Sequence, residues 1–446
     1  MREGQLRRVL TLWDLIVYGI VLIMPIAAVP LYGLVEMQSG GHAVPALLIG
    51  MVAMALTAYS YGKMAARYPA AGSAYTFVSL GLNPHAGFLA GWAMLVDYLL
   101  VPIACILYAA LTLERLVPGL PHWAWCLLIA AAITGVNLIG VRSTAGANLA
   151  LMIAALAVIV PFLGLAVRWL LLHAGWSGVF STVPLYHRQS FHWKTLASAT
   201  ALAALTYGGF DGVSTLSEEV ENPRRNIMLA TILVCVFTGL FSSLQIYLAQ
   251  RVQGDVTHLA NAETAFMDVA RIVGGKPLFE ALGVILILCN LGSGLTAQAG
   301  VSRLLYGMGR DNVLPERVFG HLSQRFSVPS WNLLLTGALA FGGSLWLSYE
   351  HVAELINFGA FLAFMGVNAA AIETYYRRAA KEHRRLVTDL LLPLGGLLFC
   401  FGIWLNLSRG AKVIGAGWLA VGIAYDLVLT KVLGHTAKPF SSGEKA

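Results

Sequence analysis

Residues 207–226 read YGGFDGVSTLSEEVENPRRN and come directly after the apolar run ATALAALT. The paired glycines Gly208 and Gly209 weaken a helix at this point, because glycine loses more conformational freedom than any other residue when a helix forms. Asp211 follows at once, although the preceding run suits an apolar environment. The stretch therefore predicts an apolar helix that is interrupted beside a carboxylate.

The composition of the whole chain is that of a membrane protein. Of its 446 residues, 58% are hydrophobic and only 11% are charged, whereas soluble domains carry about 25% charged residues. Apolar stretches long enough to cross a hydrocarbon layer of about 30 Å recur from end to end. Backbone amides in lipid must find partners within the protein, so we expect an all-α integral membrane protein. The five cysteines show no metal-ligand spacing, and we expect neither a metal nor a cofactor.

Twelve transmembrane helices are predicted from the apolar stretches. They cover approximately residues 12–36, 43–64, 87–113, 122–140, 146–171, 196–217, 227–250, 275–300, 330–349, 352–376, 387–407 and 414–434. With the N-terminus in the cytoplasm, 20 of the 29 Lys and Arg residues fall on the cytoplasmic side, as the positive-inside rule requires. We expect a multi-pass protein of the cell (inner) membrane with both termini cytoplasmic. The basic residues lie in short connections between spans, which argues against a nucleic-acid partner.

The first span, LWDLIVYGIVLIMPIAAVPLYGLV at residues 12–35, is also expected to be interrupted. Pro25 and Pro30 lie in its interior, and each proline removes a helix hydrogen bond and frees a carbonyl. Freed groups are tolerated in a membrane only where protein neighbours or a water-filled cavity satisfy them. Interruptions in the first and sixth spans match transporters built from inverted repeats, with the substrate between the breaks. Simple kinking is the alternative, because Gly and Pro are common in membrane helices.

On the transporter interpretation, the chain is a single transmembrane domain over residues 1–446. Two inverted five-helix repeats would cover approximately residues 12–171 and 196–376, and two C-terminal helices would follow at 387–434.

The clearest ionisable residues inside the predicted spans are Asp97, in GWAMLVDYLLVP, and Asp211. A carboxylate at the centre of a bilayer costs about 2.5–3.5 kcal/mol on insertion scales, so it usually faces a cavity or a partner. Asp211 is the candidate for contact with a cationic group, and capping of the half-helix after the break is the alternative. Tyr98 points about 100° away from Asp97. We expect Tyr98 to line the centre and Asp97 to contact a neighbouring helix, with proton transfer as a second role.

Glu218 and Glu219 lie two turns after Asp211, near the predicted cytoplasmic end of the sixth span. We interpret them as gating residues that pair with the loop arginines Arg224 and Arg225, in preference to substrate contacts. An intramembrane enzyme would need a constellation such as H-E-x-x-H or G-x-S-x-G, and the sequence has neither. We therefore do not expect an enzyme. A receptor that binds a substrate without moving it is the remaining alternative.

Three motifs, in this order, resemble the amino acid-polyamine-organocation permeases. They are AYSYGKMAARYPAAGSAYTFV at 58–78, GFDGVSTLSEEVENPRRNI at 209–227 and SRLLYGMGRDNVLPERVFG at 302–320. Within that family the likeness is greatest to bacterial putrescine importers. The resemblance implies a twelve-helix fold of the leucine-transporter type and secondary active uptake, commonly proton-coupled, of a small amine or amino acid.

The resemblance also implies substrate contacts at two unwound segments. In the first and sixth helices the matching residues are Met24, Pro25, Ile26, Ala27, Ala28, Tyr207, Gly208, Gly209, Phe210 and Asp211. Asp211 matches the acidic position that related polyamine and cationic amino acid carriers use to recognise an amine.

The sequence departs from the family pattern at two places, in the first span and in the fifth. Amino acid permeases usually carry a Gly-x-Gly turn whose free amides hold the substrate carboxylate, and here Pro25 supplies no amide. This favours a substrate without a carboxylate, although the putrescine importers carry an aspartate where this chain has Pro30. The fifth span has no lysine between Arg142 and Arg168, so coupling by such a lysine is not expected.

From the residues and the resemblance together, we expect an importer of putrescine or a related diamine that works by alternating access. An amino acid permease, acting as a proton symporter or an exchanger, is the alternative. The expected partners are the amine or amino acid substrate, the lipid bilayer and a coupling ion, for which the proton is the first candidate.

Overall fold

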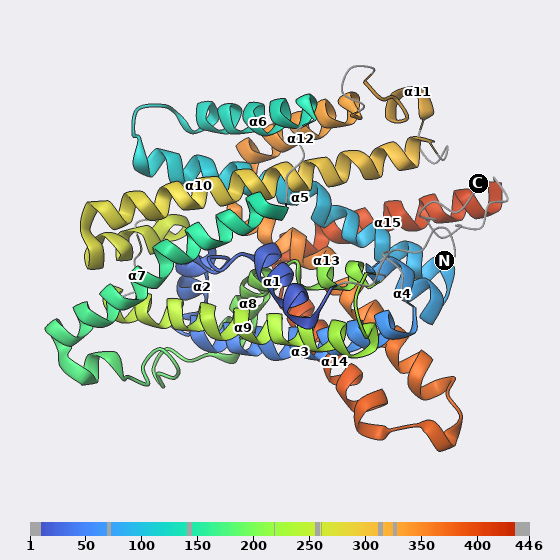
Figure 1. The fold of residues 1–446 in the computed structure, drawn as a ribbon, viewed down its shortest axis with the longest axis horizontal. Coiled ribbons are helices and arrows are strands. Elements are labelled where there is room, and N and C mark those ends of the chain that lie inside the picture. Colours follow the sequence, from blue (N-terminus) through green and yellow to red (C-terminus); the bar gives the residue numbers. More distant parts are fainter. Residues whose placement is uncertain are drawn as a thin grey trace.

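The computed structural model describes residues 10–68, 73–140, 145–217, 219–254, 259, 261–310, 315–323 and 328–432. Over these ranges the protein is helical, and two isolated β-bridges are its only strand-like pairings. The expectation of an all-α fold is therefore confirmed for the described residues. Figure 1 shows the arrangement of the helices.

The α-helices follow one another along the chain with few long connections. They are α1 (Leu12–Ile23), α2 (Tyr32–Ser39), α3 (Ala43–Arg67), α4 (Ser73–Gly81), α5 (Pro84–Leu116), α6 (His122–Ile139), α7 (Ala145–Val179), α8 (Trp193–Ala203), α9 (Pro223–Gln253), α10 (Ala265–Arg310), α11 (Glu316–Phe319), α12 (Ser330–Trp346), α13 (Tyr349–Ile372), α14 (Leu392–Leu405) and α15 (Arg409–Val432). Shorter 3₁₀ segments are η1 (Val29–Leu31), η2 (Ala204–Tyr207), η3 (Phe210–Leu216), η4 (Ala262–Thr264) and η6 (Lys381–His383). Two π-helical segments, η5 (Glu373–Arg377) and η7 (Leu386–Leu391), flank η6.

Nine helices within the described ranges are long and apolar enough to cross a membrane. The three other predicted spans differ: 330–349 becomes α12, with 17 residues, and 12–36 and 196–217 are each divided into shorter helices. The count of twelve crossings and the inverted repeats stay predictions. The elements α7 and α10 also run beyond their predicted spans, and each is divided by a kink at a positive-φ glycine, Gly175 in α7 and Gly275 in α10.

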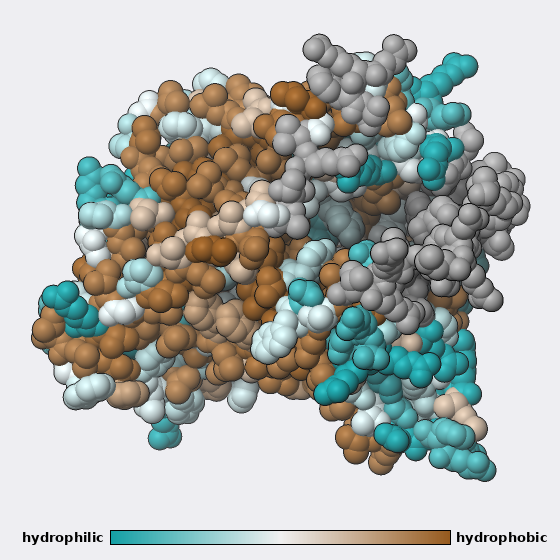
Figure 2. Space-filling view, in the orientation of Figure 1, coloured by the Kyte–Doolittle hydropathy of each residue, from teal (hydrophilic) through white to brown (hydrophobic). Residues whose placement is uncertain are grey.

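The long helices lie roughly along one axis of the molecule. Figure 1 shows α3, α9 and α10 running along this axis, with the α7–α8 connection at one end and the α13–α14 connection at the other. Hydrophobic residues cover most of the face over α7, α9 and α10 in Figure 2, and hydrophilic residues gather where the α13–α14 connection projects. Val160, Leu240 and Val284 are among the large apolar side chains that lie exposed. Such a surface is suited to contact with lipid chains rather than with water.

Close packing between α3 and α9 fixes the scaffold beside both interrupted helices. A Cβ atom built on Gly62 would lie 2.4 Å from the Cα atom of Met228, so only glycine allows the two backbones to approach this closely. Membrane helices commonly use small residues in this way, because van der Waals packing holds them together.

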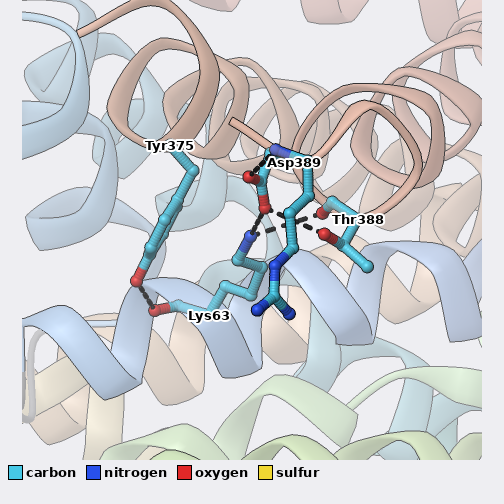
Figure 3. A network of polar contacts seen from close by, with 5 residues as sticks. Lys63, Tyr375, Thr388 and Asp389 are labelled. Atoms are coloured by element: carbon cyan, nitrogen blue, oxygen red, sulfur yellow. Dashed lines mark hydrogen bonds and ion pairs between the residues drawn. The ribbon is translucent and has the colours of Figure 1, made fainter. Parts of the chain in front are cut away.

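Polar contacts around one ion pair join α3, η5 and η7 at the end of the bundle that carries the α13–α14 connection (Figure 3). Lys63 on α3 donates to the carboxylate of Asp389 on η7 and to the carbonyl oxygen of Thr388, at 3.3 Å. The hydroxyl of Tyr375 on η5 donates to the Lys63 carbonyl at 2.7 Å, and the Lys63 ammonium lies 4.0 Å from the centre of its ring. Lys63 therefore ties α3 to both π-helical segments.

Candidate substrate site

The first predicted span is interrupted directly after α1. Met24 has φ +67°, which is uncommon for a residue other than glycine. Residues 24–28 form turns, in which the Ala27 amide donates to the Met24 carbonyl at 3.2 Å. The chain then resumes as η1 and α2. Pro25 has no amide to continue the α-helical ladder, which explains why the break falls here.

A side chain from another helix satisfies the carbonyl that this break frees. Gln245 on α9 donates from Nε2 to the Pro25 carbonyl oxygen at 2.8 Å, and the Gln245 side chain is fully buried. One lone pair of the Pro25 carbonyl is therefore already used within the protein. This arrangement meets the requirement that irregular backbone in a membrane finds partners inside the protein.

The sixth predicted span loses its α-helical ladder over a longer stretch. After α8 the chain continues as η2, and Gly209 adopts φ +102°, a conformation that side-chain-bearing residues rarely adopt. The amide of Gly212 then donates to the Gly209 carbonyl at 3.1 Å, and η3 begins. The segment after the break is thus a 3₁₀-helix, where the sequence led us to expect an α-helical half.

The two breaks lie against each other. A Cβ atom on Gly212 would come within 2.7 Å of Leu22 Cδ1, near the end of α1. Tyr207 is fully buried and donates its hydroxyl to the Leu47 carbonyl on α3 at 2.7 Å. Its side chain therefore anchors the second break to α3, and a substrate contact at Tyr207 would have to use its backbone.

Asp211 lies in the first turn of η3 and is half-buried. It interacts electrostatically with Asp97 and Tyr98, both on α5. Tyr98 is 43% exposed although it lies in the middle of a 33-residue helix, and Gly208, three residues before Asp211, is also exposed. These groups form an accessible acidic region next to the breaks, and two carboxylates within electrostatic range of each other favour a bound cation.

A model of the family described as "Amino acid permease" matches residues 14–408. The chain belongs to the amino acid permease family. The low-affinity putrescine importer PlaP of Escherichia coli (strain K12) is 32% identical, and the alignment covers 96% of this chain and 94% of that protein. The methylthioribose transporter of Bacillus subtilis (strain 168) is 26% identical over 94% of this chain and 93% of that protein. The mitochondrial cationic amino acid transporter 3 of Arabidopsis thaliana is 26% identical over 83% of this chain and 63% of that protein.

The comparisons confirm the resemblance to the amino acid-polyamine-organocation permeases. They identify the protein as a multi-pass membrane transporter and not as an enzyme. The names of these relatives state different substrates, so membership of the family does not determine the substrate of this permease.

The structure describes only one of the two glutamates that were predicted to gate the permease. Glu218 lies outside the described residues. Glu219 is half-buried and interacts electrostatically with Tyr18 of α1, and its carbonyl accepts a hydrogen bond from the Leu10 amide at 3.0 Å. Within the described ranges Glu219 forms no ion pair with Arg224 or Arg225. In this conformation the segment after η3 is instead paired through its backbone with the chain before α1.

The α2 side of the breaks is closed by aromatic side chains. Tyr32 and Tyr108 are fully buried. The Tyr32 ring packs edge-to-face on Phe266, with the ring centres 5.6 Å apart, and Tyr108 packs on Tyr349 at 5.2 Å. Tyr98 and Gly208, by contrast, are exposed.

Proposed function

We propose that this permease is a secondary active importer of a small amine, with putrescine or a related diamine as its substrate. The position of Asp211 carries the proposal, because this carboxylate lies at the second break within electrostatic range of Asp97 and of the exposed Tyr98. An ammonium group bound there would offset the repulsion between the two carboxylates. A diamine carries two such groups, one for each carboxylate.

The first break supports a substrate without a carboxylate. Binding of an anion at a helix start needs free backbone amides. Pro25 has none, the Met24 amide donates to the Ile20 carbonyl of α1 at 2.9 Å, and the Ala27 amide donates to the Met24 carbonyl at 3.2 Å. The 32% identity to the E. coli putrescine importer over nearly the whole chain points to the same class of substrate.

The proposed mechanism is alternating access in a twelve-helix fold with two inverted repeats. In support, the interrupted elements α1–α2 and α8–η3 are each followed by a long helix, α3 and α9, and these two helices pack closely together. Rocking of one repeat against the other would expose the breaks to each side in turn. We place the protein in the inner membrane with both termini cytoplasmic, because the hydrophilic α13–α14 connection then faces the cytoplasm.

An amino acid substrate is the second candidate. The family name and the 26% identity to a plant cationic amino acid transporter favour it. A cationic amino acid would use Asp211 for its side-chain ammonium but would need another partner for its carboxylate.

A competition panel with purified protein in lipid vesicles tests the proposal. Uptake of labelled putrescine should be inhibited by diamines and much less by monoamines or by amino acids. Counterflow of putrescine should distinguish transport from simple binding, because a receptor does not exchange substrate across the membrane. Uptake of amino acids without any uptake of putrescine would reject the diamine proposal.

A further inference from the structure

A carboxylate far from the site described above is buried in the outer part of the first interrupted span. Glu36 lies on α2 and its exposed fraction is 0%. Neither carboxylate oxygen has a hydrogen-bond partner among the residues that the structure describes. The backbone amide of Ala43, at the start of α3, lies close to the carboxylate without completing a hydrogen bond. Glu36 is therefore a buried acid without the partners that a charged carboxylate needs.

The titratable and charged groups around α2 do not compensate a charge on Glu36. From the elements packed against α2 they are Tyr32 on α2 itself, His42 before α3, Lys194 on α8, Glu263 on η4, and Asp268 and Arg271 on α10. None of them forms an ion pair with Glu36 in the described ranges.

Three of these groups are engaged elsewhere. Asp268 pairs with Arg115, Glu263 accepts a hydrogen bond from the Tyr349 amide at 3.3 Å, and His42 accepts one from the His187 amide at 3.1 Å. Because an unpaired buried charge is expensive, Glu36 holds a proton in the closed arrangement seen here.

The helix that carries Glu36 packs directly against η4. One turn before Glu36, a Cβ atom on Gly33 would lie 2.2 Å from the Ala262 carbonyl oxygen, so α2 and η4 touch backbone to backbone. The break at residues 24–28 separates α2 from α1 and allows α2 to move as a separate unit. Movement of α2 away from η4 would bring water to Glu36 and remove the reason for it to hold a proton.

Two buried hydroxyls lie between α2 and the second break. They belong to Tyr32 and Thr206, which line a small cavity of about 10 Å³ together with apolar side chains. The hydroxyls of both residues are buried and have no partner within the described residues. Thr206 immediately precedes Tyr207 and the exposed Gly208, so the cavity lies between α2 and the second break.

We propose that Glu36 carries the coupling proton of this permease. With α2 lifted from η4, the carboxylate takes one proton from the outer solution and becomes a neutral carboxylic acid. Closure buries the acid together with the bound substrate. The acid then releases the same proton toward the inner side past the hydroxyls of Tyr32 and Thr206. This inference rests on the proposed function, because it names the group that couples amine import to a proton gradient.

The test compares gradient-driven accumulation with counterflow in vesicles that contain Glu36→Gln. Glutamine mimics the neutral acid but cannot release a proton. A gradient of one pH unit can drive about tenfold accumulation for each proton carried. We expect about tenfold accumulation of putrescine with the wild-type protein and none above equilibrium with the variant, while counterflow changes less than about twofold. Glu263→Gln is the matched control, because its side chain can still accept the Tyr349 hydrogen bond, and it should keep both activities.

Gradient-driven accumulation by Glu36→Gln at the wild-type level would overturn the inference. Wild-type counterflow without any response to the pH gradient would also overturn it and would leave the proposed function intact. Absence of both putrescine binding and exchange in the wild-type protein would instead reject the proposed function. If Glu36→Gln cannot be purified, Glu36→Asp is tested in its place. This variant should still accumulate putrescine, with a shifted dependence on pH. An unchanged dependence on pH would refute the assignment of Glu36.

Discussion

Replacement of Asp211 by asparagine removes the charge that the proposed amine contact needs while it keeps the size of the side chain. Asp211 is half-buried at the second break and interacts electrostatically with Asp97 and Tyr98. A hydrogen bond to a charged group contributes about 1.5–3 kcal/mol, which corresponds to about 10–150-fold weaker binding when it is lost. We therefore expect Asp211→Asn to raise the KM for putrescine within this range.

The same substitution should not weaken the protein itself. In the absence of a cation, Asp97 and Asp211 repel each other, so removal of one charge relieves a repulsion. At a putrescine concentration of about 100 times the wild-type Kd, binding stabilises the folded state by about 2.7 kcal/mol. With 10–150-fold weaker binding, this stabilisation falls to about 0.3–1.4 kcal/mol. The variant should thus keep its Tm without ligand and lose about half or more of the increase that putrescine produces.

Thermal unfolding in detergent, with and without putrescine, and initial rates of labelled uptake in vesicles measure these two effects. Glu280→Gln is a suitable control, because Glu280 is exposed and pairs with Lys276 on the surface of α10. An Asp211→Asn protein with wild-type KM and a wild-type thermal shift would refute the amine contact. A lower Tm without ligand would show that Asp211 has a structural role instead, such as capping of η3.

Three further predictions concern the polar contacts that hold the interrupted helices and the scaffold. Gln245→Leu leaves the Pro25 carbonyl without its donor and should destabilise the protein by about 1–3 kcal/mol, seen as a lower Tm, whereas an unchanged Tm would mean that another group satisfies the carbonyl. Lys63→Met leaves the Asp389 carboxylate, 9% exposed, without its partner and should cost about 3 kcal/mol or more; the double variant with Asp389→Leu should recover part of this loss, and additive losses would argue against the ion pair. Tyr207→Phe should cost about 0.5–1.5 kcal/mol and leave the KM unchanged, because the lost hydroxyl contacts α3, and a large rise in KM would place it at the substrate.

The interruptions were predictable from the sequence because their causes are local. Pro25 removes its own amide, and Gly209 allows a backbone conformation that few other residues tolerate. The composition likewise predicted an all-α membrane protein. The 3₁₀ form of η3 was not expected, because nothing in its seven residues distinguishes i→i+3 from i→i+4 hydrogen bonding.

The partners of the candidate site depend on contacts between residues far apart in the chain. Gln245 appears in the sequence only as a polar residue in an apolar helix, and its bond to Pro25 spans 220 positions. Glu36 is near the end of a predicted span, where a carboxylate would ordinarily reach water, and its burial follows from the packing of α2 among α3, α8, η4 and α10. The contacts of Gln245 and the burial of Glu36 arise from the docking of whole helices, so no local sequence pattern predicts them.

The two breaks are chemically unequal, and this inequality suggests how binding and coupling are divided. At the first break Gln245 already satisfies the Pro25 carbonyl, so that break is suited to motion of α2 more than to recognition. At the second break Asp211 lies beside the exposed Gly208, where a substrate ammonium can reach it. Glu36 travels with α2, whereas Asp211 stays with η3, so the proton and the amine would bind to separate parts of the protein. On these proposals their coupling would require no direct contact, because proton binding and amine binding would each favour the same closed arrangement.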